Sequence, residues 1–139
     1  MHKLTPILTV DAIEPCLPFW TETLDFELTL TVPHEDKIGF AMLQKDAVEI
    51  MYQTRASIDA DLGGSGAPEG LGSELASGAA LLFIEVEGID ALLPALEQAE
   101  VVVPRRTTSY GMDEVFVRAP CGTVIGFAAR TSGARTDEA

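Results

Sequence analysis

Ile7-Leu8-Thr9-Val10-Asp11-Ala12-Ile13 and Phe83-Ile84-Glu85-Val86-Glu87-Gly88-Ile89 are two similar stretches that decide the fold. They lie 76 residues apart (83 minus 7), and the same offset relates Pro18 to Pro94. Each stretch has the apolar alternation of a strand and leads into a segment with helical signals, at about Pro15–Leu24 and Ala91–Ala99. Matched residues, a matched proline and a matched element order together are hard to obtain by chance. The sequence therefore predicts an internal repeat.

Strand-like runs follow each predicted helix, separated by turn signals at Gln44–Asp46 and Ala119–Gly122. The runs of the first half are Glu27–Val32, Lys37–Gln44 and Ala47–Gln53, and those of the second half are Val101–Arg106, Glu114–Arg118 and Val124–Ala129. Each half is therefore predicted to have the element order β-α-β-β-β.

The chain length of 139 residues suits one domain with a hydrophobic core. Within it we predict a first module over residues 3–57 and a second over residues 78–130. The stretch between them, residues 58–77, is rich in glycine and has no steady apolar period, so it is interpreted as a linker or mobile loop. Residues 131–139 form a polar tail that is expected to fray.

The composition excludes some partners. Nine basic and 22 acidic residues give a formal charge of -13, which opposes binding to the phosphates of nucleic acid. That charge fits a cationic partner, although solubility alone explains it more simply.

The longest apolar stretch, Ala79–Ile84, is too short to span a bilayer, and no signal-peptide pattern is present, so we expect a cytoplasmic protein without a membrane partner. Cys16 and Cys121 are then expected to be free thiols.

Several motifs carry a family resemblance over nearly the whole chain. They are Val10-Asp11, Pro18-Phe19-Trp20-Thr21-Glu22-Thr23-Leu24-Asp25-Phe26-Glu27, and the closing pair Tyr110–Arg118 and Pro120–Phe127. With the repeated βαβββ module, they resemble the vicinal oxygen chelate superfamily, in its glyoxalase/bleomycin resistance protein branch. Ala119 departs from the family, which usually has Asp before the hairpin proline. The resemblance implies an α+β fold in which two βαβββ modules form a curved mixed sheet around a ligand.

The metal-dependent relatives place one metal ligand on the first strand and one on the last strand of each module. Carried over by position, these places fall on Thr5, Glu49, Leu81 and Gly126. Only Glu49 is an ordinary metal ligand, whereas Leu81 and Gly126 offer no side-chain donor, and a divalent ion needs several. We therefore predict no metal and no other cofactor.

Alternation places Thr5, Ile7 and Thr9 on the concave ligand face, and Leu4, Leu8 and Val10 under the helices, with Ile125 and Phe127 also in the core. Glu49 and Glu85 then become carboxylates in a largely apolar hollow with flat aromatic surface, which suits an organic ligand with a positive group. The predicted ligand-binding residues are Thr5, Phe40, Glu49, Phe83, Glu85, Tyr110 and Phe116. The alternative is that Glu85 lies at a solvated rim and Tyr110 packs in its hairpin, while Trp20 is interpreted as core or interface packing.

The sequence is compatible with three functions. The first is a metal-free small-molecule binding protein that resembles the antibiotic-sequestering bleomycin resistance proteins, and the resemblance implies a homodimer because that branch forms its crevices between subunits. The second is an enzyme of the same superfamily, a divalent-metal-dependent lyase, isomerase or dioxygenase with a degenerate site, in which Glu49 is the base or the sole metal anchor. The third is a regulatory module that binds a metabolite. Nucleophilic catalysis has little support, because no serine motif of the nucleophile-elbow type occurs and no histidine is placed to activate Cys16 or Cys121.

Overall fold

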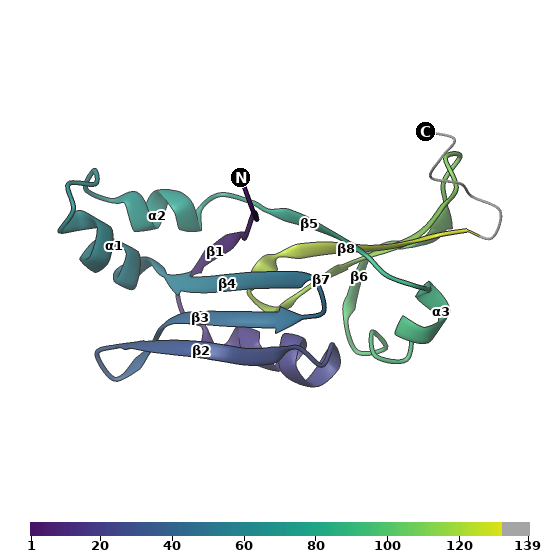
Figure 1. Cartoon of the computed structure of the whole chain (residues 1–139), viewed down its shortest axis with the longest axis horizontal. Coiled ribbons are helices and arrows are strands. Elements are labelled where there is room, and N and C mark those ends of the chain that lie inside the picture. Colours follow the sequence, from purple (N-terminus) through teal and green to yellow (C-terminus); the bar gives the residue numbers. More distant parts are fainter. Residues whose placement is uncertain (132–139) are drawn as a thin grey trace. The chain divides into compact units, whose positions relative to one another are not determined.

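The computed structural model describes residues 1–131 and divides into two compact units, Met1–Ala79 and a second that begins at Ala80 (Figure 1). The boundary lies close to the end of the predicted linker at residue 77. Each unit contains one β-α-β-β-β module, as the internal repeat predicts. The predicted polar tail, residues 131–139, lies outside the described residues except for Thr131.

The first unit is built on a mixed sheet with the strand order β1-β4-β3-β2, in which only the pair β1 and β4 is parallel. Short turns join the antiparallel strands: His34 pairs with Lys37, and Lys45 pairs with Val48. Asp46 takes a positive φ of 52° in the second turn. The strands are β1 (Ile7–Val10), β2 (Glu27–His34), β3 (Lys37–Lys45) and β4 (Val48–Thr54).

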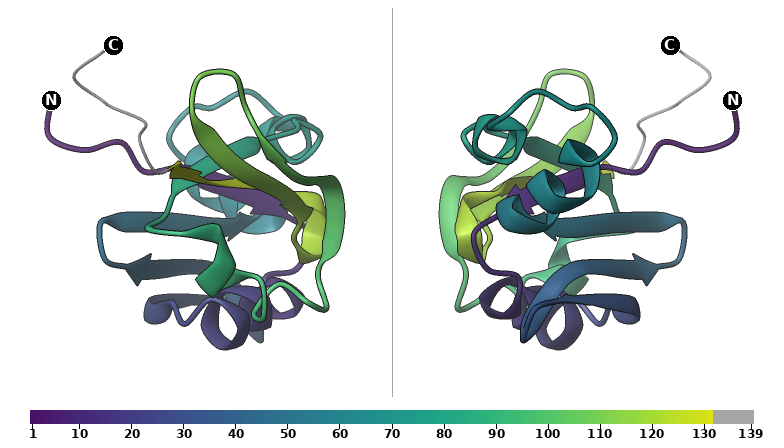
Figure 2. Two further views of the ribbon diagram at one scale, coloured as in Figure 1. Left: turned by 90° about the vertical axis from the view of Figure 1, so that its right-hand side faces the viewer. Right: turned by 90° about the vertical axis from the view of Figure 1, so that its left-hand side faces the viewer.

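The segment between β1 and β2 is helical but is not the single helix predicted over Pro15–Leu24. It consists of a 3-10 turn, η1 (Glu14–Cys16), and a π-helical turn, η2 (Phe19–Thr23), and Figure 2 shows this segment coiled beside β2. The helix is interrupted because Pro15 and Pro18 lack the backbone N–H groups that a continuous α-helix needs. The Trp20 Nε1 donates a hydrogen bond to the Tyr52 hydroxyl at 2.9 Å, so the segment packs on the face of the sheet that carries Tyr52.

The second unit repeats this topology, with the order β5-β8-β7-β6 and a parallel pair β5 and β8. Its helix α3 begins at Ile89 and ends at Leu92, so the predicted helix Ala91–Ala99 is largely replaced by irregular turns. Ile89 and Leu96 from this segment are buried. The other elements are β5 (Leu81–Glu85), β6 (Glu100–Thr107), β7 (Met112–Arg118), the 3-10 turn η3 (Pro120–Gly122) and β8 (Val124–Arg130).

The interpretation of residues 58–77 as a linker or mobile loop is wrong, because two helices occupy most of that stretch: α1 (Arg55–Gly63) and α2 (Leu71–Ala76). The Thr54 hydroxyl caps α1 by accepting a hydrogen bond from the Ser57 N–H at 3.1 Å. The Asp59 carboxylate accepts one from the Gly72 N–H at 2.8 Å and so joins α2 to α1. Capping and close packing stabilise helices whose sequence lacks an apolar period. No helix within residues 1–131 is long and apolar enough to cross a membrane.

The alternation of the strands agrees with the predicted core, with one exception. Leu8 and Val10 are buried in the first unit, and Ile125 and Phe127 are buried in the second. The prediction that Leu4 packs under the helices is wrong, since Leu4 is exposed and precedes the first residue of β1. A residue outside the sheet has no partner strand to fix the direction of its side chain.

The two cysteines differ from their prediction. No cysteine within residues 1–131 is free. The expectation of free thiols is therefore wrong. It depended on the sequence spacing and on the absence of a secretion signal, and neither shows where the folded chain carries a sulfur atom.

Candidate functional site

The face of the first sheet opposite Trp20 carries most of the first module's predicted ligand residues. We call it the first open face. Cross-strand register arranges it in an apolar row, a mixed row and a polar row. The apolar row is Ile7, Met51, Met42 and Leu30; the mixed row is Thr9, Gln53, Phe40 and Val32; the polar row is Glu49, Gln44 and Glu27. Phe40 is half-buried here, and the predicted alternation of β1 and β4 is present.

Glu49 is held in place by two donors from the segment that precedes β1. The Lys3 Nζ lies 2.7 Å from the Glu49 Oε1, and the Thr5 hydroxyl donates to the same oxygen at 3.2 Å. The Lys3 ammonium is the main reason that the pKa of the Glu49 carboxyl lies below its usual value, and the Thr5 hydrogen bond acts in the same direction. The structure thus brings Thr5 and Glu49 together as predicted and adds Lys3, which the sequence reasoning missed.

The corresponding face of the second sheet, which we call the second open face, also has rows with distinct chemistry. Its aromatic row contains Phe83, Gly126, Phe116 and Val103, and its charged row contains Glu85, Ala128, Glu114 and Arg106. A third row is formed by Leu81, Val124, Arg118 and Glu100. The aromatic row and the charged row are adjacent, because consecutive residues on one face of a strand are two positions apart.

Phe83 and Phe116 lie on either side of Gly126 in the sheet. Phe83 is exposed, while Phe116 is half-buried and its ring covers Gly126. A Cβ atom at residue 126 would lie 2.5 Å from the Phe116 Cε2 and 2.9 Å from its Cδ2 and Cζ. The Phe116 ring therefore occupies the space into which a side chain at position 126 would extend.

This contact predicts that Gly126→Ala destabilises the protein by about 1–3 kcal/mol, as overpacking does, because the Phe116 ring must move. Urea unfolding followed by circular dichroism measures the loss. Adding Phe116→Ala should remove most of the cost of the added methyl group, and a double-mutant cycle tests that coupling. Gly63→Ala is the control, since a Cβ at residue 63 meets nothing within 4 Å. Equal effects at the two glycines would contradict the placement of the ring.

Glu114 is the principal site residue that the sequence prediction missed. Its side chain is only 2% exposed, and it forms an ion pair with Arg106, whose Nε and Nη2 lie 3.1 Å and 3.0 Å from the Glu114 Oε1. The Tyr110 hydroxyl reaches the other oxygen, Oε2, at 3.5 Å. Alternation in β7 could have indicated Glu114, because it lies two residues before Phe116 and so shares its face.

The other predicted residues of the second open face have more open surroundings. The Glu85 side chain is 60% exposed, and its Oε2 lies 3.9 Å from the Arg130 Nε. Tyr110 is exposed as well, in the turn between β6 and β7, with its hydroxyl directed to Glu114. Glu85 and Glu114 both neighbour Ala128 in the register, so the two carboxylates flank one small residue.

The residues at the family's metal positions do not fit a divalent metal. In the second unit, Leu81 has no donor and the Phe116 ring fills the space at Gly126. In the first unit, the Glu49 oxygen is already bound by Lys3 and Thr5. Within residues 1–131, no group of three or more His, Cys, Asp or Glu side chains is arranged to hold a metal ion.

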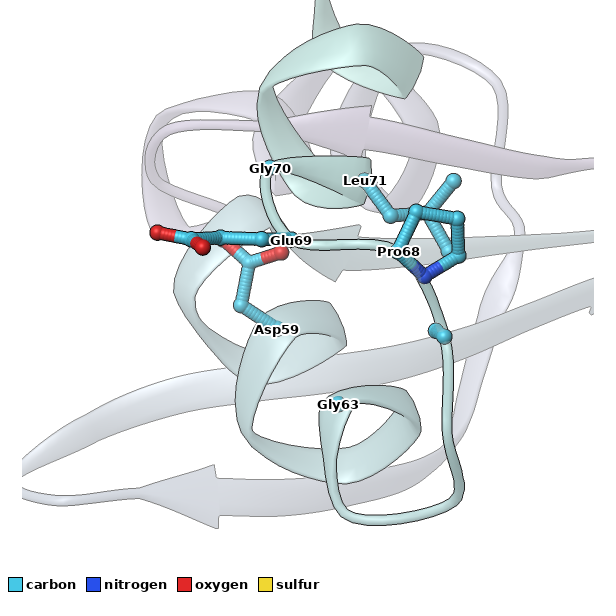
Figure 3. Close-up of a pocket in the computed structure, with 7 residues that line it drawn as sticks. Asp59, Gly63, Pro68, Glu69, Gly70 and Leu71 are labelled. Atoms are coloured by element: carbon cyan, nitrogen blue, oxygen red, sulfur yellow. The ribbon is translucent and has the colours of Figure 1, made fainter.

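A separate hollow of about 360 Å³ lies between α1 and the loop that leads into α2 (Figure 3). Asp59, Glu69 and Leu71 contribute side chains to it. The Asp59 carboxylate already accepts the Gly72 N–H, so it serves the packing of the two helices. None of the predicted ligand residues lines this hollow.

The fold and these faces define a paired-module protein with one open face in each unit. Residues 2–127 match the model of the Glyoxalase/Bleomycin resistance protein/Dioxygenase superfamily. The chain belongs to this family, as the resemblance of its motifs indicates. The comparison with curated protein sequences found no match.

Solved structures of other proteins share this fold. One is a glyoxalase/bleomycin resistance protein/dioxygenase from Nocardioides, with 19% identity, a TM-score of 0.71, and coverage of 98% of this chain and 88% of that one. TioX from Micromonospora sp. ML1 has 17% identity, a TM-score of 0.69, and coverage of 94% and 99%. A glyoxalase-related enzyme from Fulvimarina pelagi has 14% identity, a TM-score of 0.69, and coverage of 94% and 89%. At these identities the similarity shows the fold alone.

Proposed function

We propose that the protein binds a small organic ligand that carries a positive group, without a resident metal, as the antibiotic-sequestering members of its family do. The observation that carries the proposal is the second open face, where the aromatic row adjoins the charged row. An exposed aromatic ring such as Phe83 offers flat surface and attracts cations, and a nearby carboxylate adds charge pairing. We further propose that it acts as a homodimer and captures its ligand stoichiometrically.

Glu85 is the carboxylate best suited to pair with such a ligand. It is exposed, and its contact with Arg130 is long, at 3.9 Å. Glu114 is buried and its charge is balanced by Arg106, so it shapes the site without offering a second unpaired charge. The Phe116 ring lies over Gly126, and beside Phe83 it forms part of the floor of the face. The ligand face therefore combines apolar contact with one accessible negative group.

Calorimetric titration with bleomycin-type glycopeptides and other cationic aromatic compounds tests the proposal. For a compound that binds, Phe83→Ala should weaken the affinity about tenfold, because an aromatic contact is lost. Glu85→Gln should weaken it about two- to fivefold at low ionic strength, and less in high salt.

Two exposed residues of the same unit provide matched controls. Leu93→Ala removes exposed apolar surface in the turns after α3, and Glu97→Gln removes one negative charge there, so neither should change the affinity. No heat and no thermal shift across the panel would contradict ligand capture. A stoichiometric divalent ion in the purified protein, together with turnover that Glu49→Gln abolishes, would favour the enzyme instead.

A further inference from the structure

The carboxylate of Glu49 already binds an ammonium group that belongs to the chain itself. The Lys3 Nζ lies 2.7 Å from its Oε1, and the Thr5 hydroxyl reaches the same oxygen. The Glu49 side chain is only 13% exposed, whereas that of Lys3 is 61% exposed. The carboxylate thus has a fixed position in β4, while its cation comes from an exposed side chain.

The segment that carries Lys3 is only lightly attached to the sheet. Residues 1–6 have no regular secondary structure, and residues 1–4 are exposed. The Met51 N–H donates to the Pro6 carbonyl at 3.0 Å, and strand β1 begins at the next residue, Ile7. Before Pro6, the side-chain hydrogen bonds and ion pairs within residues 1–131 are those of Lys3 and Thr5 with Glu49. The Lys3 side chain is 61% exposed, so its ammonium group returns to water at small cost, and an incoming ammonium group keeps the less exposed Glu49 carboxylate paired.

Apolar side chains lie directly beside the Glu49 carboxylate. Met51 is two residues further along β4 on the same face, and Ile7 pairs with it from β1. Met42 continues this apolar row on β3. An alkyl or arylalkyl chain can therefore lie along the row with a charged head at Glu49, which is the arrangement of charge and methylene groups that Lys3 itself offers.

We propose that Glu49 is a subsite for a primary ammonium group and that Lys3 occupies it until a ligand displaces it. The inference goes beyond the proposed function, because it assigns a further ligand site on the first open face and gives its ligand class as an ammonium ion on an apolar chain. Lys3 is then a tethered competitor. The apparent affinity for the ligand is reduced by the fraction of molecules in which Lys3 holds the subsite. Removing the Lys3 charge should increase the affinity for such ligands.

The test uses NMR titration of the full chain with 4-phenylbutylammonium, and with the neutral 4-phenylbutanol as its matched probe. At low ionic strength, Lys3→Met should bind the ammonium probe about two- to fivefold more tightly than the original protein, and the gain should shrink in high salt. The affinity for the alcohol should not change. Glu49→Gln should remove the preference for the ammonium probe over the alcohol. Lys37→Met is the charge-matched control, because Lys37 is exposed at the start of β3 and far along the strand from Gln44, the partner of Glu49.

The outcomes separate this inference from the proposed function. If the ammonium probe binds the original protein and Lys3→Met equally well, the inference is overturned while ligand binding stands. The same holds if Lys37→Met tightens binding as much as Lys3→Met, since the effect is then one of net charge. Binding to Lys3→Met that is absent in the original protein supports the inference strongly. If neither probe nor any compound of the calorimetric panel binds any variant, both proposals fail.

Discussion

Trp20→Ala is expected to lower the free energy of unfolding by about 3–5 kcal/mol, the loss typical of deleting a large buried aromatic side chain. Trp20 is fully buried and packs edge-on against Phe19 and Phe26, with ring centroids 5.4 Å and 4.9 Å away. Its N–H donates to the Tyr52 hydroxyl, so the alanine variant loses both the packing and this partner. Such a loss is a large part of the 5–15 kcal/mol typical of a folded domain. Urea unfolding followed by circular dichroism measures it, because Trp20 is the only tryptophan and its fluorescence disappears with it.

Two variants give this prediction its controls. Trp20→Phe keeps much of the apolar volume but removes the N–H donor, so we expect an intermediate loss of about 1–3 kcal/mol. Leu93→Ala removes an exposed apolar side chain in the turns after α3 and should change stability by no more than about 0.5 kcal/mol. A loss at Trp20 as small as that at Leu93 would show that residues 14–23 do not pack on the first sheet.

The order of the elements could be predicted because its signals are local. The apolar alternation of Ile7–Val10 and its copy at Phe83–Val86 reports which side chains are buried, and the structure buries Leu8 and Val10 as expected. Trp20 lies in the core, in agreement with its interpretation as packing. Each of these predictions needs only a strand period and a repeat, both of which are visible along the chain.

The helices were harder to predict, since their stability depends on contacts distant in sequence. Residues 58–77 contain α-helices because Asp59 binds the Gly72 N–H and Thr54 caps the first of them, and neither contact leaves an apolar period. The prediction of free thiols was wrong for the same reason, because the state of a cysteine depends on the folded chain.

The sequence could predict which residues of the candidate site share a face of the sheet, but not which charged side chains form ion pairs. Alternation places Phe83, Glu85 and Phe116 on one face, and register confirms that these residues share it. The Lys3 contact with Glu49 could not be foreseen, because residues 1–6 have no strand geometry to direct the lysine. Alternation in β7 places Glu114 on the same face as Phe116, so its position could have been predicted. Its burial and its ion pair with Arg106 depend on the folded chain and could not.

Arg106→Met is expected to lower the free energy of unfolding by about 3 kcal/mol, at the lower end of the range for breaking a buried ion pair. The cost arises from the Glu114 carboxylate, which stays buried after the arginine is removed. Glu114 is 2% exposed, and without Arg106 its carboxylate keeps only the long hydrogen bond from Tyr110 at 3.5 Å. A buried charge without a partner costs far more than an exposed one, because water cannot replace the lost contact. Methionine retains the length and apolar character of the arginine stem, so the experiment isolates the loss of the charge.

The matched control is Arg105→Met, the neighbouring residue on β6. Arg105 binds Asp113 at 2.7 Å and Asp90 at 2.6 Å and holds the pKa of the Asp113 carboxyl below its usual value. The Asp90 side chain is largely exposed and that of Asp113 partly so, hence water solvates both carboxylates when the arginine is lost, and the destabilisation should be much smaller than at Arg106. Glu114→Gln introduced into Arg106→Met should recover part of the stability, because it removes the unpaired buried charge. Equal losses at Arg105 and Arg106, with no recovery in the double variant, would show that Glu114 is accessible to water and that the charged row of the second open face lies in solvent.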